Sequence, residues 1–329
     1  MTVRAAYRLD PPEWADRLAV LESVGLADAE TDARARVVAR DGDEVTIEFP
    51  ALARETDAAV LMSSLAAGEW ADRADMLSCR LVAVEWPPGL PGPAFRPADG
   101  AVVGAIVKPA LGFSPTEAAA VAAELAAGGA VLVKDDELMT SPPYSPLEER
   151  TRRIAERLPE GVRYAANVTG PHAGLLGRAA AAVAAGAGAL MLNAFAQGLP
   201  ALQALRAAEL GVPLFAHRVG AAFLRRGDPV SVSARVLAEL TLLLGADYVQ
   251  VGSFGERTFD TDEEVREQIA ACRGRATAVI GGGVGPRNAR EQLELAGDPS
   301  GLMLLLGSEA YAHPGGVRAG VAATVAALA

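Results

Sequence analysis

The stretch Val131-Leu132-Val133-Lys134-Asp135-Asp136-Glu137 is an apolar run that ends in four charged residues. Its three apolar, mostly β-branched residues predict a strand that is buried on both faces. Because side chains alternate along a strand, we expect Lys134 and Asp136 on one face and Asp135 on the other. A buried lysine among carboxylates is costly unless the charges are paired or bind something. The end of this strand is therefore the first candidate site.

The same pattern of an apolar run followed by a helix recurs along the rest of the chain. The predicted strands are Ala101–Val107, Ala130–Lys134, Val162–Val168, Ala189–Leu192, Val212–Ala216, Asp247–Val251, Thr277–Ile280 and Gly301–Leu306. Eight strand–helix units in roughly 230 residues have the size and rhythm of an α/β fold of the (β/α)₈ TIM-barrel type. A doubly wound open sheet is the competing arrangement, but eight near-uniform units favour closure.

A smaller domain is expected ahead of this barrel. Residues 1–98 predict a short α+β domain, and residues 99–329 predict the (β/α)₈ catalytic domain. The Pro- and Gly-rich stretch Pro87–Pro93 indicates the linker between them. The elements expected in the N-terminal domain are a strand at Val3–Leu9, a helix at Pro11–Val24, a hairpin of Arg34–Arg40 with Glu44–Phe49, and a strand at Leu81–Trp86.

The composition favours a soluble, cytoplasmic protein. No apolar run is long enough to span a membrane, and the N-terminal residues lack the apolar core of a signal peptide. The net charge of −11, without a basic cluster, argues against nucleic acid or an anionic membrane as partner. Cys79 and Cys272 lack the spacing of a metal or redox site, so we expect buried, reduced thiols.

The lysine content is unusual. Lysine and arginine together number 30, and only Lys108 and Lys134 are lysines, which leaves 28 arginines. Surface positions accept either residue, whereas chemistry that needs a deprotonatable amine requires lysine. Both lysines lie at predicted strand ends, which indicates a chemical role. The alternative is that two lysines simply remain in an arginine-rich composition.

The carboxyl ends of the predicted strands carry the other candidate residues. In a (β/α)₈ barrel the active site lies at these ends. The last two strands end in Gly281-Gly282-Gly283 and Gly307-Ser308, and backbone N–H groups in such loops favour a phosphate. Tight-turn chemistry explains the glycines equally well. The polar residues at the strand ends are Lys108, Lys134, Asp136, Glu137, Asn167, Asn193, His217 and Arg218.

The residue types in this set favour the binding of a divalent metal ion. Asp136 and Glu137 offer the hard oxygen ligands that suit Mg²⁺. Lys134 as an ammonium ion has donors only, so it is a salt-bridge partner, a Schiff-base nucleophile, or a carbamate formed with CO₂ that supplies an anionic oxygen. We expect the adjacent acids to raise the pKa of Lys134, which opposes a free nucleophile. Lys108, on the neighbouring strand, is a candidate acid or base.

Five blocks of sequence carry a family resemblance. In the same order, they resemble the large subunit of ribulose bisphosphate carboxylase (RuBisCO), over about residues 101–329. The resemblance is specific in the block that contains the candidate metal ligands, Lys134-Asp135-Asp136-Glu137. The blocks are Gly104-Ala105-Ile106-Val107-Lys108-Pro109-Ala110-Leu111-Gly112, Gly128-Gly129-Ala130, Lys134-Asp135-Asp136-Glu137, Phe215-Ala216-His217-Arg218 and Gly307-Ser308-Glu309-Ala310-Tyr311-Ala312-His313-Pro314.

This resemblance implies a (β/α)₈ domain with Mg²⁺ held by carbamylated Lys134, by Asp136 and by Glu137. It also implies a homodimer, because family members usually pair so that the neighbour's N-terminal domain closes each site. The further roles that it implies are Lys108 as the enolising base, Asn167 near the metal, His217 and Arg218 on the substrate, and Gly282, Gly283, Gly307 and Ser308 on phosphate.

Several positions depart from the carboxylase pattern. Ala110 replaces the second lysine of the Lys-Pro-Lys motif, Ala221 replaces a histidine, and Gly281 replaces a serine. The mobile lysine of the loop after the sixth strand has no equivalent, because Glu256-Arg257 stand there and only Arg257 supplies a positive charge. These departures argue against CO₂ fixation. The chain resembles instead the RuBisCO-like proteins, or form IV type.

The block Asp135–Met139, followed by Pro142-Pro143-Tyr144-Ser145-Pro146, resembles the RuBisCO-like proteins of sugar-acid catabolism. Their shared step is loss of a proton or of CO₂ next to a ketone, which a bound metal promotes by stabilising negative charge. We therefore expect a lyase that decarboxylates a 3-oxo-sugar-acid phosphate. An isomerase or enolase of a methylthio-pentulose phosphate is the second expectation. A metal-free Schiff-base aldolase and a non-catalytic protein that binds a phosphorylated metabolite remain alternatives.

Overall fold

Two compact units make up the chain. The computed structural model describes residues 2–21, 34–66, 73 and 75–328. One unit comprises Met1–Pro91 together with Gly220–Leu240, and the other comprises Gly92–Val219 together with Thr241–Ala329. We call the first the N-terminal unit and the second the barrel unit.

A five-stranded sheet lies at the centre of the N-terminal unit, in the order β10-β4-β1-β3-β2. β1 (Val3–Asp10) is antiparallel to both β3 (Glu44–Phe49) and β4 (Ser78–Glu85), and β2 (Arg36–Asp41) forms a hairpin with β3. The helical elements are α1 (Trp14–Leu21), the 3₁₀ turn η1 (Pro50–Leu52) and α2 (Ala58–Leu65). The predicted α+β class is confirmed. The last three residues of the helix predicted at Pro11–Val24 lie outside the described residues.

The segment Gly220–Leu240 departs from the sequence-based division. The expected domains, 1–98 and 99–329, are each continuous, whereas the structure groups this segment with the N-terminal unit. Within it, α8 (Ala221–Arg225) leads to β10 (Val230–Val232), which pairs in parallel with β4. A three-residue strand is too short to show a periodic pattern, and its partner is distant in sequence, so local sequence does not reveal the pairing.

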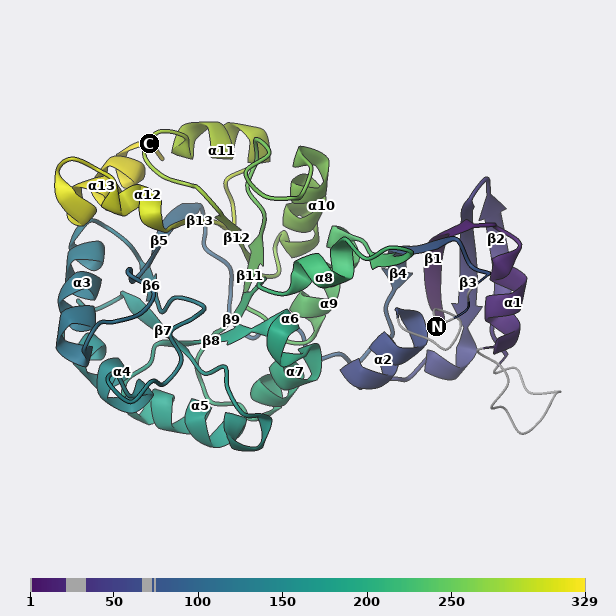
Figure 1. The fold of residues 1–329 in the computed structure, drawn as a ribbon, viewed down its shortest axis with the longest axis horizontal. Coiled ribbons are helices and arrows are strands. Elements are labelled where there is room, and N and C mark those ends of the chain that lie inside the picture. The colour runs from purple at the N-terminus through teal and green to yellow at the C-terminus, as the bar shows by residue number, and fades with distance from the viewer. Residues whose placement is uncertain (1, 22–33, 67–72, 74, 329) are drawn as a thin grey trace. The chain divides into compact units, whose positions relative to one another are not determined.

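The barrel unit is a closed ring of eight parallel strands, in the order β11-β12-β13-β5-β6-β7-β8-β9 (Figure 1). Each strand coincides with a predicted run to within two residues at either end. The predicted (β/α)₈ fold is therefore confirmed. The strands are β5 (Ala101–Ile106), β6 (Leu132–Lys134), β7 (Arg163–Asn167), β8 (Ala189–Asn193), β9 (Leu214–His217), β11 (Tyr248–Val251), β12 (Thr277–Gly281) and β13 (Leu302–Leu306).

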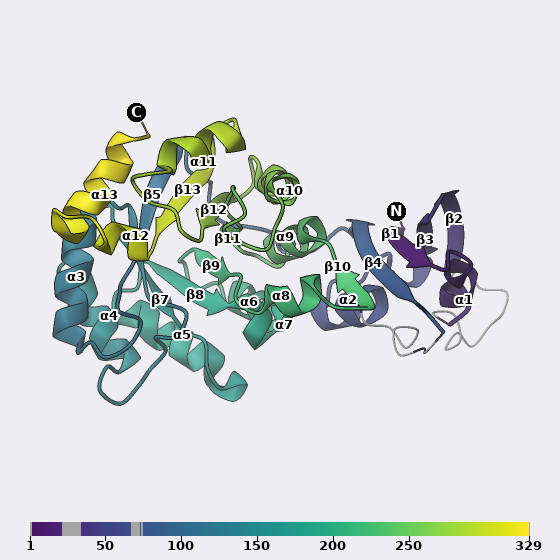
Figure 2. The ribbon, with the colours of Figure 1, turned by 45° about the horizontal axis from the view of Figure 1, so that its top comes forward.

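Helices surround this ring: α3, α4 and α5 lie outside β6 and β7 in Figure 1, and they lie outside β7 in the turned view of Figure 2. The start of α3 is set by a capping box, in which Ser114 and Glu117 exchange hydrogen bonds. The remaining helical elements are α3 (Pro115–Ala127), α4 (Leu147–Ala155), η3 (His172–Gly174), α5 (Leu175–Ala184), α6 (Ala194–Gln197), α7 (Leu199–Ala207), α9 (Ala234–Leu243), α10 (Asp262–Cys272), α11 (Ala289–Ala296), α12 (Ser308–Tyr311) and α13 (Gly316–Ala326).

Apolar side chains fill the inside of the barrel. Gly104 leaves room there for the Met303 side chain, because a Cβ at this position would lie 2.6 Å from the Met303 sulfur. The filled interior leaves the strand ends as the place where polar side chains gather. The cluster comprises Leu132, Ala165, Ala189, Met191, Phe215, Val279, Met303 and Leu305. Among the described residues, no helix combines the length and the apolar character needed to cross a membrane.

Candidate active site

Lys134 ends β6, next to Ile106 at the end of β5. Its side chain is fully buried, and Nζ donates a hydrogen bond to the Asp135 carbonyl oxygen at 2.7 Å. Nζ also lies 5.6 Å from the centre of the Phe215 ring. Burial lowers the pKa of Lys134 to about 8, although the nearby carboxylates of Glu137 and Asp136 act in the opposite direction. The acids thus raise this pKa as expected, but the loss of water around the amine outweighs them, so the net change is a lower pKa.

Lys108 and Asp136 form an ion pair beside Lys134, between Lys108 Nζ and Asp136 Oδ2. Asp136 is buried, whereas the Lys108 side chain is 30% exposed and can be reached from solvent. The Lys108 backbone N–H donates to the Tyr311 hydroxyl at 2.8 Å, and this hydroxyl donates to the Ile106 carbonyl oxygen at 2.9 Å. Tyr311 thus fixes the backbone at Lys108. The resemblance included this tyrosine but assigned it no role.

Glu137 and His217 face one another across the strand ends, with 3.6 Å between His217 Nε2 and Glu137 Oε2. The Val219 N–H donates to His217 Nδ1 at 3.2 Å, so the neutral ring carries its proton on Nε2. Burial, together with the positive charges of Lys134 and Arg218, holds the pKa of His217 well below its usual value. His217 is therefore a neutral donor directed toward Glu137.

Two asparagines hold the backbone that carries the carboxylates. The Asn167 side-chain amide donates to the carbonyl oxygens of Asp136 and Glu137, each at 3.2 Å. The Asn193 amide donates to the same Glu137 carbonyl oxygen at 2.9 Å. Both asparagines end neighbouring strands, β7 and β8, which explains their shared target. Asn193 Oδ1 is buried and has no hydrogen-bond partner among the described residues.

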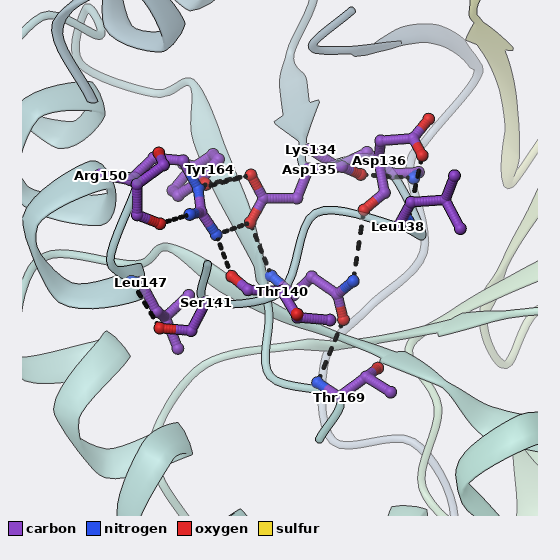
Figure 3. A network of polar contacts seen from close by, with 12 residues as sticks. Lys134, Asp135, Asp136, Leu138, Thr140, Ser141, Leu147, Arg150, Tyr164 and Thr169 are labelled. Carbon is purple, nitrogen blue, oxygen red and sulfur yellow. Dashed lines mark hydrogen bonds and ion pairs between the residues drawn. The ribbon is translucent and has the colours of Figure 1, made fainter. Parts of the chain in front are cut away.

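Asp135 points away from the two lysines, as strand alternation predicts. Figure 3 shows its carboxylate directed toward Arg150 and Tyr164, whereas the Asp136 carboxylate lies on the other side of the strand end. Tyr164 OH donates to Asp135 Oδ1 at 2.6 Å, and the Arg150 guanidinium pairs with both oxygens. Sequence reasoning missed Arg150 and Tyr164. The only signal was the buried Asp135 itself, which needs a partner that the sequence does not identify.

Arg218 lies in a different environment from the one expected. Its Nη2 pairs with Asp260 Oδ2 at 2.5 Å, and its guanidinium stands 4.9 Å from the centre of the Phe259 ring. Asp260 is buried, so it compensates much of the arginine charge. Arg218 Nη1 is buried without a hydrogen-bond partner among the described residues. A substrate contact for Arg218 stays a prediction, and Asp260 is a further residue that the sequence did not indicate.

The predicted phosphate loops follow β12 and β13, which are paired neighbours. Gly282 and Gly283 have φ values of +114° and +71°, which only glycine adopts at low cost. Arg257 Nη1 donates to the Gly283 carbonyl oxygen at 3.0 Å, so Arg257 contacts this loop. Gly307 and Ser308 follow β13. These conformations agree with turn chemistry, and phosphate binding by the two loops stays a prediction.

The donor set determines how Mg²⁺ could fit. Among the described residues, no three His, Cys, Asp or Glu side chains come together as a metal site. Asp136 and Glu137 supply two carboxylates, and the fully buried Lys134 that precedes them carries an amine that CO₂ can convert into an anionic oxygen donor. The residues therefore fit Mg²⁺ if Lys134 is a carbamate.

Comparison with known proteins identifies the family. The profile of "Ribulose bisphosphate carboxylase large chain, catalytic domain" matches residues 93–329. The chain belongs to the RuBisCO large-chain family. The resemblance seen in the sequence is thus confirmed, and the relatives below support a RuBisCO-like protein within that family.

The relatives include proteins named as enzymes. A 3-oxo-isoapionate-4-phosphate decarboxylase of Rhizobium etli is 30% identical over 310 residues, which is 85% of this chain and 73% of that protein. A 2,3-diketo-5-methylthiopentyl-1-phosphate enolase of Microcystis aeruginosa is 33% identical over 241 residues, or 70% of this chain and 62% of that protein. A ribulose bisphosphate carboxylase-like protein of Bordetella bronchiseptica is 30% identical over 239 residues, and this chain spans 56% of its length.

Solved structures support the same fold. The octameric RuBisCO of Pyrococcus horikoshii has a TM-score of 0.89 at 26% identity, over 99% of this chain and 87% of that one. A RuBisCO-like protein of Burkholderia fungorum has a TM-score of 0.84 at 24% identity, over 99% of this chain and 93% of that one.

Proposed function

We propose that this RuBisCO-like protein is a Mg²⁺-dependent decarboxylase of a phosphorylated 3-oxo-sugar acid. One observation carries the proposal: fully buried Lys134 lies beside Asp136, Glu137 and Lys108 at the ends of adjacent barrel strands. Similarity to a decarboxylase of such a substrate supports the choice of reaction. The mobile loop lysine of the carboxylases is missing, and Arg257, the positive charge in that loop, is hydrogen-bonded to Gly283. This loop is therefore unsuited to CO₂ fixation.

The metal site would consist of Lys134 as its carbamate, Asp136 and Glu137. Carbamate formation needs a neutral amine, and burial makes this form accessible by lowering the pKa of Lys134 to about 8. When bound, Mg²⁺ would polarise the substrate ketone and stabilise the negative charge that develops next to it.

The remaining side chains would handle the substrate and its protons. Loss of CO₂ leaves an electron pair on the carbon next to the ketone, and Lys108 as an ammonium can return a proton to it. His217 carries a proton on Nε2 and can donate a hydrogen bond to a substrate oxygen. The N–H groups of the loops after β12 and β13, at Gly282, Gly283, Gly307 and Ser308, would bind the phosphate.

The first experiment measures CO₂ release from 3-oxo-isoapionate 4-phosphate. We expect release to stop when EDTA is added and to recover with Mg²⁺ and bicarbonate. Turnover that is insensitive to EDTA, together with borohydride trapping of the substrate on Lys134 or Lys108, would support the Schiff-base aldolase instead. Binding without turnover across a panel of keto-sugar phosphates would support the non-catalytic alternative.

A second candidate is enolisation of 2,3-diketo-5-methylthiopentyl 1-phosphate, which similarity to the enolase supports. The same residues suffice, because proton removal by Lys108 replaces loss of CO₂. Substrate deuteration in D₂O without CO₂ release would identify this activity. We also propose that the protein is a homodimer, which light scattering during gel filtration would test.

A further inference from the structure

Arg150 occupies an unusual place for an arginine. It lies in α4 with no exposed surface, although arginine is rarely buried unless it is paired. Its guanidinium forms a fork with Asp135: Nε donates to Oδ1 and Nη2 donates to Oδ2, both at 3.1 Å (Figure 3). Burial disfavours the charged guanidinium, but Asp135 more than offsets this and keeps the pKa of Arg150 above its usual value.

The same guanidinium also binds the loop between β6 and α4. Nη1 donates to the Ser145 carbonyl oxygen at 2.5 Å, and Nη2 donates to the Thr140 carbonyl oxygen at 2.6 Å. Asp136 and Glu137 are the second and third residues of this loop. Neutralising Asp135 needs neither carbonyl contact, so these two bonds act on the loop itself.

A second route connects Arg150 to the carboxylates. Asp135 Oδ2 accepts a hydrogen bond from the Asn167 backbone N–H at 2.9 Å. The Asn167 amide in turn holds the carbonyl oxygens of Asp136 and Glu137. Arg150 therefore holds the start of the loop indirectly, through Asp135 and Asn167. It holds the later part of the loop by direct hydrogen bonds to backbone carbonyls.

We propose that Arg150 is a positioning residue that fixes the backbone carrying Asp136 and Glu137. Its meaning for metal binding rests on the proposed function, whereas its effect on the loop does not. Fold stability alone does not explain the residue, because replacing a buried ion pair by apolar side chains is often neutral or stabilising. A lysine would keep the charge but lacks the planar fork that serves Asp135 and two carbonyls together.

The first test compares Arg150→Lys with a matched control, Arg206→Lys. Arg206 in α7 also pairs with a buried carboxylate, Asp247, and donates to the Gly245 carbonyl oxygen, but it contacts the start of β11. Hydrogen exchange of residues 136–146 is measured by mass spectrometry without metal. We expect exchange roughly tenfold faster in Arg150→Lys and unchanged there in Arg206→Lys. Equal exchange in the two variants would overturn the inference.

The second test measures Mn²⁺ binding by calorimetry in the presence of bicarbonate. We expect binding weaker by about 10–100-fold in Arg150→Lys and unchanged in Arg206→Lys, because residues behind metal ligands typically contribute this much. Wild-type protein that binds no Mn²⁺ would refute the proposed metal function, and the exchange measurement would still decide on Arg150. Wild-type affinity in Arg150→Lys would overturn its link to the metal.

A double variant covers the case in which Arg150→Lys does not fold. Asp135→Asn combined with Arg150→Met removes both charges and leaves no uncompensated ion. We expect this protein to fold but to exchange residues 136–146 faster than wild type. Wild-type exchange in the folded double variant would also overturn the inference.

Discussion

Asp247 holds the start of β11 to its neighbours, and Asp247→Asn tests how strongly. Oδ1 accepts hydrogen bonds from the backbone N–H groups of Ala94 and Phe95 at 2.8 and 2.9 Å. Oδ2 accepts from the Leu214 N–H at 2.7 Å and pairs with Arg206. An asparagine has one acceptor oxygen, so its NH₂ group would face donors on one side. The substitution also leaves the largely buried Arg206 charge uncompensated.

Breaking a buried ion pair in this way lowers the free energy of unfolding by about 3–5 kcal/mol. In a unit of this size we expect Tm to fall by roughly 10 °C. All three tryptophans lie in residues 1–91, so their fluorescence does not report on the barrel unit. Cys272 at the end of α10 reports on the barrel unit, because its thiol is buried and becomes reactive only on unfolding. The free energy of unfolding is therefore measured by labelling Cys272 during a urea titration.

Glu156→Gln is the matched control. Glu156 pairs with Arg153 on the surface at 3.9 Å, with both side chains more than half exposed. We expect Glu156→Gln to change the free energy of unfolding by less than about 1 kcal/mol. If Asp247→Asn cost no more than Glu156→Gln, the reasoning about the buried carboxylate would be refuted.

Three further outcomes follow. Lys134→Met should fold but lose Mn²⁺ binding in calorimetry, since the third anionic donor cannot form; retained affinity would exclude the carbamate. Lys108→Met should lower kcat for CO₂ release or proton exchange by about 10²–10⁴-fold with little change in KM, as expected for a general acid or base; an unchanged kcat would remove that role. Cys79 and Cys272 should resist thiol reagents in the native state, because burial raises the pKa of both thiols, to about 12 for Cys272; rapid native labelling would contradict this.

Much of the barrel was predictable because its signal is local. A strand such as Leu302–Leu306 is buried on both faces and therefore reads as a continuous apolar run. The return of Val230–Val232 to the sheet of the N-terminal unit was not predictable, since a three-residue strand is specified by its partner β4. The position of the lysines and carboxylates at strand ends followed directly from the barrel rule.

The sequence by itself determined the eight-fold strand pattern, the alternation that separates Asp135 from Lys134 and Asp136, and the family. Only the tertiary structure decided which arginine pairs with Asp135, since 28 arginines are equivalent until the chain folds. The direction of the pKa change at Lys134 also depended on the fold. Neighbouring charges can be read from the sequence, but the loss of solvent that outweighs them arises only when the barrel closes around the amine.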